Sequence, residues 1–183
     1  MGAVSMSNLV SNTGVVATDV TGVGTIKGYL AACEYGGDKG IFGYGEISGV
    51  PNYSMTNLVS NVGVVSTDVT GVGTGRRGLA ACSYGGDKGI FGYGVYNTPT
   101  PNTQTNLTNL VSNVGVVSTD VTGVGTARSN LKATQYGQDK GIFGYGSPGP
   151  TAVTNLVSNV GVVATDITGV GTARTSLAAC SYN

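Results

Sequence analysis

Apolar residues in this sequence occur in short runs that are separated by glycine-rich turn signals. The run Leu79–Tyr84 is followed by Gly-Gly-Asp-Lys and then by a second run, Gly89–Gly94. Runs of this length between turn residues are typical of β-strands, and two in succession predict a hairpin. No segment combines good helix formers with apolar residues at i, i+3, i+4 and i+7, the pattern of an amphipathic helix. The sequence therefore predicts an all-β protein.

Two further short segments follow each hairpin. Asn109–Asn113 and Val116–Asp120 flank the tight turn Asn113–Gly115, where glycine supplies the positive φ that such turns need. Each unit of about 50 residues is therefore expected to contain about four short strands, which gives about sixteen at most in the chain.

The same short sequence motifs recur along almost the whole chain, which indicates a repeat architecture. We expect residues 1–183 to form a single repeat domain. Asn-Leu-Val-Ser-Asn begins its units near residues 8, 57, 109 and 155. The differences in length between units fall in three variable segments that hold all five prolines: Glu46–Thr56, Val95–Thr108 and Ser147–Thr154.

The order of these segments resembles a kelch repeat. An Arg precedes the first strand in Thr126–Leu131, an apolar strand ends in glycines in Lys140–Gly146, and Asn155–Asn159 and Val162–Asp166 correspond to the third and fourth strands. Gly-Tyr-Gly stands where kelch repeats have a double glycine, and the kelch Trp is absent. Four-stranded units of this size are the blades of β-propellers. The resemblance implies a small β-propeller of about four four-stranded blades.

The chain order also predicts how such a ring would close. Asn8–Asp19 would supply the third and fourth strands of the last blade, Leu177–Tyr182 its first strand, and Gly2–Met6 would stand in for the missing second strand. Closure by both termini would remove exposed sheet edges. The alternative is a larger ring or an open stack in which several chains pair their incomplete ends.

The repeat is also similar to kelch-like repeat proteins of marine bacteriophages, which are regarded as virion structural proteins. This resemblance implies a non-enzymatic structural or interaction module in the virion, such as a tail, fibre or capsid-decorating protein. Its partners would be other virion proteins or further copies of itself. The alternative is a lectin-like, glycan-binding propeller that recognises a host surface glycan and mediates host attachment.

Composition narrows the range of partners. Glycine accounts for 32 of 183 residues, and nine basic side chains balance nine acidic ones. Nucleic acids and acidic membranes attract clusters of Lys and Arg, so we expect neither as a partner. We also expect neither a signal peptide nor a transmembrane segment, so a soluble protein is the alternative to a virion location.

One basic residue precedes the first strand of each unit. These residues are Lys27, Arg76, Arg128 and Arg174. They are candidates for a ring of positive charge at one mouth of a central channel, where they would bind an anion or an acidic peptide. The alternative is that each side chain satisfies carbonyl groups or an Asp of the neighbouring blade.

Catalytic chemistry is difficult to build from equivalent residues. An acid–base pair needs two carboxylates in different environments, whereas Asp19, Asp68, Asp120 and Asp166 occupy one repeat position, where we interpret them as turn residues that bond nearby amides. Cys33, Cys82 and Cys180 also share one position, and without any histidine a nucleophilic thiol has no base partner. We therefore expect no enzymatic activity, no metal site and no cofactor.

The aromatic residues suggest two different roles. The pairs Phe42/Tyr44, Phe91/Tyr93 and Phe143/Tyr145 have strand spacing and are expected to pack in the core. The alternative is that they stack on sugars. Tyr53 and Tyr96 lie in variable segments and are the candidates for contact with a partner. Because these segments all join the same two strand types, we expect them to emerge on one face, where a partner would dock on that face or on the rim beside it. The alternative is that they are surface loops that tolerate variation and bind nothing.

Overall fold

The three-dimensional structure is a computed structural model and describes residues 3–47, 52–97 and 102–182. Within these ranges there are eleven strands and no helix, so no helix is long and apolar enough to cross a membrane. The strands are β1 (Ala31–Tyr35), β2 (Lys39–Gly43), β3 (Thr56–Val59), β4 (Ala80–Tyr84), β5 (Lys88–Gly92), β6 (Val95–Tyr96), β7 (Thr103–Gln104), β8 (Thr108–Val111), β9 (Lys132–Tyr136), β10 (Lys140–Gly144) and β11 (Thr154–Val157). The all-β prediction is confirmed.

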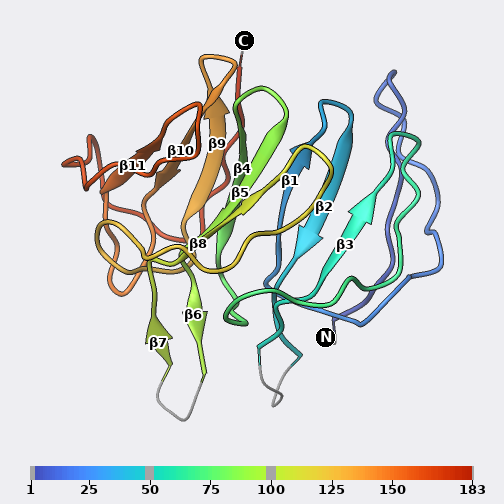
Figure 1. Cartoon of the computed structure of the whole chain (residues 1–183), viewed down its shortest axis with the longest axis horizontal. Helices are drawn as coiled ribbons and strands as arrows, with labels where there is room; N and C mark the ends of the chain where they lie inside the picture. The colour runs from blue at the N-terminus through green and yellow to red at the C-terminus, as the bar shows by residue number, and fades with distance from the viewer. Residues whose placement is uncertain (1–2, 48–51, 98–101, 183) are drawn as a thin grey trace.

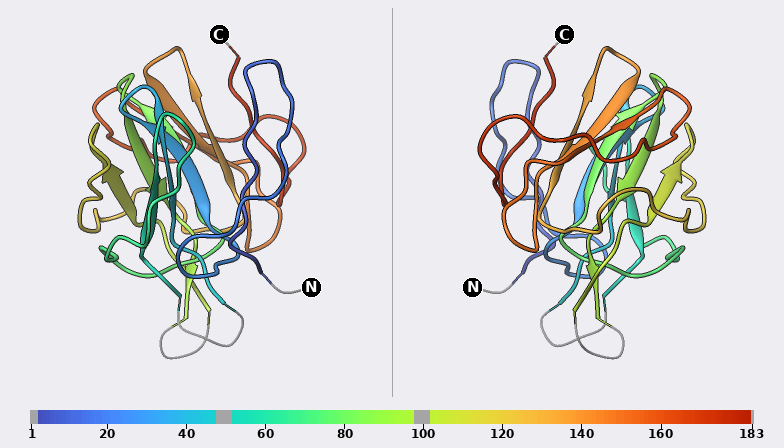
Figure 2. Two further views of the ribbon diagram at one scale, coloured as in Figure 1. Left: turned by 90° about the vertical axis from the view of Figure 1, so that its right-hand side faces the viewer. Right: turned by 90° about the vertical axis from the view of Figure 1, so that its left-hand side faces the viewer.

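Three of the sheets repeat one design (Figure 1). Each is antiparallel, with the strand orders β1-β2-β3, β4-β5-β8 and β9-β10-β11, and each central strand carries Lys-Gly-Ile-Phe-Gly. The first two strands form the predicted hairpin, in which Ala80 pairs with Gly92 and Tyr84 with Lys88. Its turn places Gly85 and Gly86 at φ angles of 63° and 81°, which glycine adopts without strain. In the third hairpin Gln138 takes the position of Gly86 with a φ of 68°. The short strands β6 and β7 form a separate hairpin, which projects below the three sheets (Figures 1 and 2).

The three sheets pack side by side through their first strands, so that β1 lies next to β4 and β4 next to β9. Glycine allows this close approach, because a Cβ added to Gly141 would lie only 2.6 Å from Cys82 Sγ of the preceding sheet. Aromatic rings fill the space between sheets. Tyr44 packs on Phe91 with ring centres 5.2 Å apart, and Tyr93 packs on Phe143 at 5.1 Å. The core position is confirmed for these four rings, whereas Phe42 and Tyr145, which were predicted with them, are only half-buried.

The prediction of a fourth strand in each unit is wrong. The segment is present, but it joins its neighbour only through isolated β-bridges. Val111 pairs with Val117 and Thr108 with Val121. Between these bridges, the Leu110 N–H donates to the Ser118 side chain at 2.9 Å instead of to a backbone carbonyl. Side-chain hydrogen bonds thus interrupt the backbone ladder that a regular strand requires.

The predicted β-propeller of about four four-stranded blades is also wrong. The described sheets have two or three strands each, and none of them closes. Residues 177–182 and 3–6 form no strand, and Gly2 lies outside the described residues. The physical reason is a missing central strand. In the sheet of β9, β10 and β11, the central β10 pairs with a strand on each side. Among the described residues, no central strand lies between residues 177–182 and residues 8–19, so these two outer segments have no strand with which both could pair.

Candidate functional site

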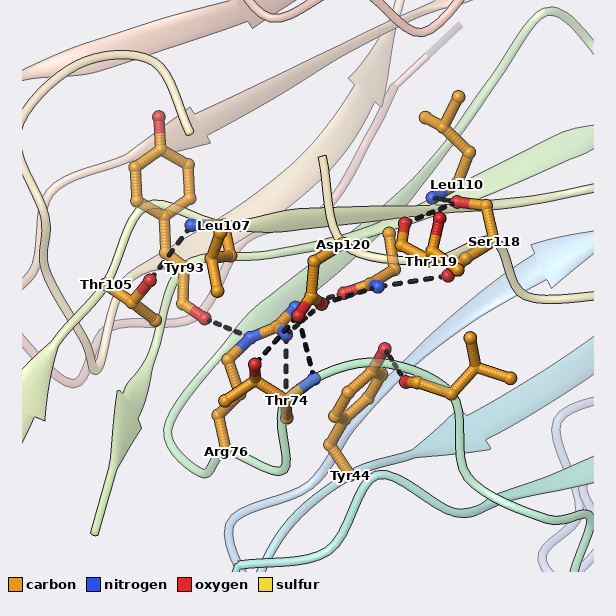
Figure 3. A network of polar contacts seen from close by, with 12 residues as sticks. Tyr44, Thr74, Arg76, Tyr93, Thr105, Leu107, Leu110, Ser118, Thr119 and Asp120 are labelled. Carbon is orange, nitrogen blue, oxygen red and sulfur yellow. Dashed lines mark hydrogen bonds and ion pairs between the residues drawn. The ribbon is translucent and has the colours of Figure 1, made fainter. Parts of the chain in front are cut away.

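Each three-stranded sheet contains one polar node, in which a buried basic side chain joins a Thr, an Asn and an Asp. In the middle sheet the basic residue is Arg76, whose side chain is completely buried (Figure 3). Its Nε donates to the Tyr93 carbonyl at 2.9 Å and its terminal nitrogens donate to Asn109 Oδ1 at 2.6 Å and to the Thr74 carbonyl at 3.1 Å. One terminal nitrogen also lies 3.4 Å from Asp120 Oδ1. The Arg76 side chain is therefore held entirely by groups of its own chain.

Both carboxylate oxygens of Asp120 also accept hydrogen bonds from groups of the same chain. Its Oδ2 accepts hydrogen bonds from the Thr74 amide at 2.9 Å and from the Thr74 hydroxyl at 2.7 Å. Its Oδ1 accepts one from Asn109 Nδ2 at 2.9 Å. Since Thr74 precedes β4 while Asp120 follows β8, the node ties the two outer edges of the sheet together.

The same node occurs in the other two sheets. Lys27 donates to Asn57 at 2.7 Å and lies 3.5 Å from Asp68, while Thr25 donates to the same Asp. Arg128 donates to Asn155 and lies 3.8 Å from Asp166, which accepts from Thr126. A Lys in the first node shows that a single charged nitrogen can reach both the Asn and the Asp.

A tyrosine with an unusual backbone lies beneath two of these arginines. Arg76 stacks on the Tyr44 ring at 4.7 Å and Arg128 on the Tyr93 ring at 4.5 Å. Both tyrosines have a φ of 65°, a left-handed conformation that is strained for a residue with a side chain. Stacking under a cation and a hydrogen bond from the Tyr93 hydroxyl to the Val124 carbonyl at 3.1 Å stabilise the strained position.

Burial and charge act against each other in the node. Burial opposes ionisation of Asp120, but hydrogen bonds from Asn109 and Thr74 and the charge of Arg76 together lower its pKa. Burial also lowers the pKa of Arg76, against the raising effects of Tyr44 and Asp120. Burial raises the pKa of Tyr44 and of Tyr93 to about 12, so both hydroxyls stay neutral near pH 7. Each node therefore holds one positive and one negative charge that neutralise each other.

The positions of the predicted basic residues decide between the two interpretations of them. Lys27, Arg76 and Arg128 are 7%, 0% and 1% exposed, so they do not form a charged ring that an external anion could reach. Arg76 and Arg128 donate to backbone carbonyls and lie beside an Asp, while Lys27 donates to the Asn57 side chain and lies beside Asp68. Arg174 is exposed and hydrogen-bonds the Tyr145 hydroxyl at 3.0 Å. The interpretation of the aspartates changes too, because Asp120 binds Thr74, which is distant in the sequence, rather than nearby amides.

Sequence reasoning missed the Thr and Asn members of the node. Thr74 and Asn109 both belong to sequence motifs that recur in every unit. Recurrence alone does not indicate that these residues bind the basic residue of the unit. The available signal was the constant spacing Thr-x-Arg before the first strand, as in Thr74–Arg76 and Thr126–Arg128. Two polar side chains separated by one residue point to the same side of an extended chain.

The variable segments begin beside the nodes. The amides of Gly45, Gly94 and Gly146 donate to the carbonyls of Arg76, Arg128 and Arg174, so each segment leaves the fold at the equivalent place. Two of the segments also contact each other. Asn52 donates to the Val95 carbonyl at 3.0 Å. Arg77 bridges the two segments, because it forms an ion pair with Glu46 at 2.9 Å and donates to Asn102 Oδ1 at 3.1 Å.

The tyrosines predicted for partner contact lie in this area. Tyr53 donates its amide to the Gly45 carbonyl at 2.8 Å and Tyr96 belongs to β6. Both residues are half-buried, and each keeps part of its surface exposed to solvent. Residues 48–51 and 98–101 of the same segments lie outside the described residues.

The first strands of the units surround a cavity of about 300 Å³. It is lined by residues of β1, β4 and β9 and by Cys180 and Ser181. Burial raises the pKa of the Cys82 thiol to about 12 and also raises that of Cys33, so both are protonated and unreactive near neutral pH. Within the described residues, no group of three or more Cys, Asp or Glu side chains could hold a metal ion.

The fold and the nodes define a repeat protein of three-stranded antiparallel sheets, each of which has its two edges tied together by a buried basic residue and an Asp. No protein-family model and no curated protein matches the sequence. Among solved structures, the chain is similar to one described as "Structure of YjhT", with a TM-score of 0.61 and 14% sequence identity. The match covers 84% of this chain and 48% of that chain, so this chain spans about half the length of that protein. At this level of identity the likeness concerns the fold alone.

Proposed function

We propose that this chain is a non-enzymatic structural and interaction module. The observation that carries the proposal is the repeated polar node, in which Arg76 and Asp120 bind each other and their neighbours instead of facing a cleft. An enzyme needs charged or nucleophilic groups that are directed at a substrate. Here the same residue types serve three times to fasten the edges of a sheet.

We further propose that the module is a component of a phage virion. The resemblance of its repeat words to kelch-like repeat proteins of marine bacteriophages supports this role. A protein that serves in a particle needs a rigid body and a surface that contacts its neighbours. The buried nodes supply rigidity, and the variable segments with Tyr53 and Tyr96 supply a surface whose chemistry differs from unit to unit.

The test of this proposal is the location and the docking surface of the protein. Mass spectrometry of gradient-purified phage particles should detect the chain at constant stoichiometry. The double substitution Tyr53→Ser and Tyr96→Ser, at half-buried tyrosines of the variable segments, should leave folding intact and abolish incorporation into particles. As a matched control, Ser substitutions at Val62, Val114 and Val160 should leave incorporation unchanged. These valines are 69–71% exposed and lie in the turns that follow β3, β8 and β11.

Two results would contradict the proposal. Absence of the chain from purified particles would exclude the virion role. Saturable glycan binding that disappears with Tyr53→Ala or Tyr96→Ala, in a chain that is not built into particles, would favour the glycan-binding alternative instead.

A further inference from the structure

We propose that two copies of this chain associate head to tail, with a fourth polar node completed across the contact between them. One copy would supply the donor half of the node, Thr172 and Arg174. The other copy would supply the acceptor half, Asn8 and Asp19. The inference rests on the geometry of the nodes and does not depend on the proposed virion role.

The donor half is already in the position of its internal equivalents. The Arg174 carbonyl accepts a hydrogen bond from the Gly146 amide at 3.0 Å, just as the Arg128 carbonyl accepts one from the Gly94 amide at 2.9 Å. The Arg174 guanidinium stacks on the Tyr145 ring at 4.7 Å, and Arg76 stacks on Tyr44 at the same distance. Within the described part of the chain, Arg174 lacks the Asn and the Asp that enclose the other arginines, and it also lacks the tyrosine carbonyl that accepts from Nε of Arg76 and of Arg128.

The acceptor half is also preformed. Asn8 Nδ2 donates to Asp19 Oδ1 at 2.9 Å and to the Ala17 carbonyl at 3.0 Å. The equivalent Asn109 makes the same two bonds, to Asp120 at 2.9 Å and to Ser118 at 3.1 Å. Among the described residues, however, Asp19 receives no Thr or basic side chain, whereas Asp68, Asp120 and Asp166 all do.

Apolar residues next to the two halves are more exposed than their internal equivalents, which are buried or half-buried. Beside the acceptor half, Val10 is 64% exposed, while the equivalent Val111 and Val157 are both 0% exposed. Beside the donor half, Tyr182 is 95% exposed, while the equivalent Tyr84 is 3% exposed. Both surfaces therefore have the composition of an interface between units but lack the neighbouring unit.

The glycines that allow close packing show the same complementarity. A Cβ added at Gly89 would lie 2.6 Å from Cys33 Sγ, and one added at Gly141 would lie 2.6 Å from Cys82 Sγ. At the equivalent Gly40, no cysteine Sγ lies as close, and the nearest atom belongs to Val59 of the same sheet at 3.6 Å. The remaining cysteine, Cys180, is exposed beside the donor half. The contact that completes the node would thus also place Cys180 of one copy against Gly40 of the next.

The two halves lie on different sheets of one chain. Arg174 bridges to Thr151 beside the sheet of β9, β10 and β11. Leu9, next to Asn8, packs on Gly63 beside β3 of the other outer sheet. Cys180 and Ser181 border the same cavity as Cys33 and Glu34 of β1. No hydrogen bond or ion pair joins the halves within the described residues. Because the contact uses two different surfaces, it can close reciprocally into a dimer or continue into a longer assembly.

The test is the mass of the purified full chain in solution over a range of concentrations, measured by analytical ultracentrifugation. The wild-type chain of 18.2 kDa should associate. Asp19→Lys and Arg174→Glu should each raise the dissociation constant at least about 30-fold, because each removes one partner of a charge pair that becomes buried. Asp38→Lys, at an exposed Asp on the hairpin turn of β1 and β2, should associate as the wild type does.

A mixture of the two variants gives the decisive result. Asp19→Lys keeps a normal donor half and Arg174→Glu keeps a normal acceptor half, so together they should form a one-to-one heterodimer although neither associates alone. A wild-type chain that stays monomeric at every concentration would overturn the inference. So would a monomer whose melting temperature falls with Asp19→Lys, because that result would place the fourth node within one chain. Unchanged association of both variants would also overturn it.

Discussion

At the scale of the residue, the important feature is a fully buried arginine that is neutralised without losing its hydrogen bonds. Burying an isolated guanidinium is costly, and the cost is offset only when nearly all of its donors are satisfied. Arg76 meets this condition with two carbonyls, an Asn and an Asp, and it also stacks on Tyr44. The stability of each sheet should therefore depend strongly on its single basic residue.

Replacing Arg76 tests this dependence. Arg76→Ala should lower the free energy of unfolding by about 3–5 kcal/mol, because Asn109 and Asp120 lose their buried donor. Arg76→Lys should cost less, about 1–3 kcal/mol, since Lys27 reaches the equivalent Asn and Asp in the first sheet. Urea unfolding of the three proteins measures both values. Equal losses for Ala and Lys would show that charge is not what the site requires.

The aspartates of the nodes should make stability depend on pH. The pKa values of Asp68, Asp120 and Asp166 are lower in the folded chain than the ordinary value of 3.8. Such groups contribute stability that is present above pH 3.8 and is lost as the pH falls through their lowered folded-state pKa values. Urea unfolding at a series of acidic pH values should show this loss. The Asp120→Asn chain, which cannot titrate at this position, should show a smaller dependence on pH, and an unchanged dependence would contradict the assignment.

At the scale of the element, the central strand of each sheet decides how sheets pack and which segments become strands. Lys-Gly-Ile-Phe-Gly supplies backbone partners on both sides, while its first glycine admits a cysteine of the preceding sheet. Where this strand is missing, the first and third segments of a unit remain irregular.

The first glycine of the central strand offers a matched pair of variants. Gly141→Ala should cost about 1–3 kcal/mol, because the new methyl group would meet Cys82 Sγ at 2.6 Å and the Ser83 carbonyl at 3.3 Å. Gly40→Ala should change stability by no more than about 0.5 kcal/mol, because its methyl group finds only ordinary contacts. Thermal unfolding at a concentration at which the chain is monomeric compares the two. A similar loss for both would mean that strand propensity, not contact with the cysteine, controls this position.

At the scale of the whole molecule, three similar sheets differ in how well they are covered. The sheet of β4, β5 and β8 has a neighbour on each side, whereas each outer sheet has one. Ile90 and Phe91 in β5 are both 0% exposed, while Phe42 in β2 is only half-buried. Near-identical strands therefore occupy different environments.

Hydrogen exchange should reveal this difference. The amides of β5 should exchange more slowly than those of β2 and β10, because local opening of the middle sheet must break contacts on both of its faces. The nearly identical sequences of the three strands act as internal controls for intrinsic exchange rates. Equal protection in all three strands would indicate that the sheets open independently of their neighbours.

The sequence by itself determined the local structure of this protein. Short apolar runs on either side of a Gly-x-Asp-Lys turn determined the hairpins, because a glycine such as Gly85 readily adopts the left-handed backbone of the turn. The repeat also predicted that equivalent residues would have equivalent roles, and this holds for Arg76 and Arg128.

Only the tertiary structure decided which groups meet across the units. Asp120 and Thr74 are far apart in the chain, and no periodicity of either word shows that they bind each other. The order of the strands suggested a closed ring, but the incomplete unit lacks the central strand that would hold its edges together, so the ring does not form. A repeat in the sequence specifies what each unit contains, whereas closure depends on whether the first and last units together supply every strand of the sheet that would join them.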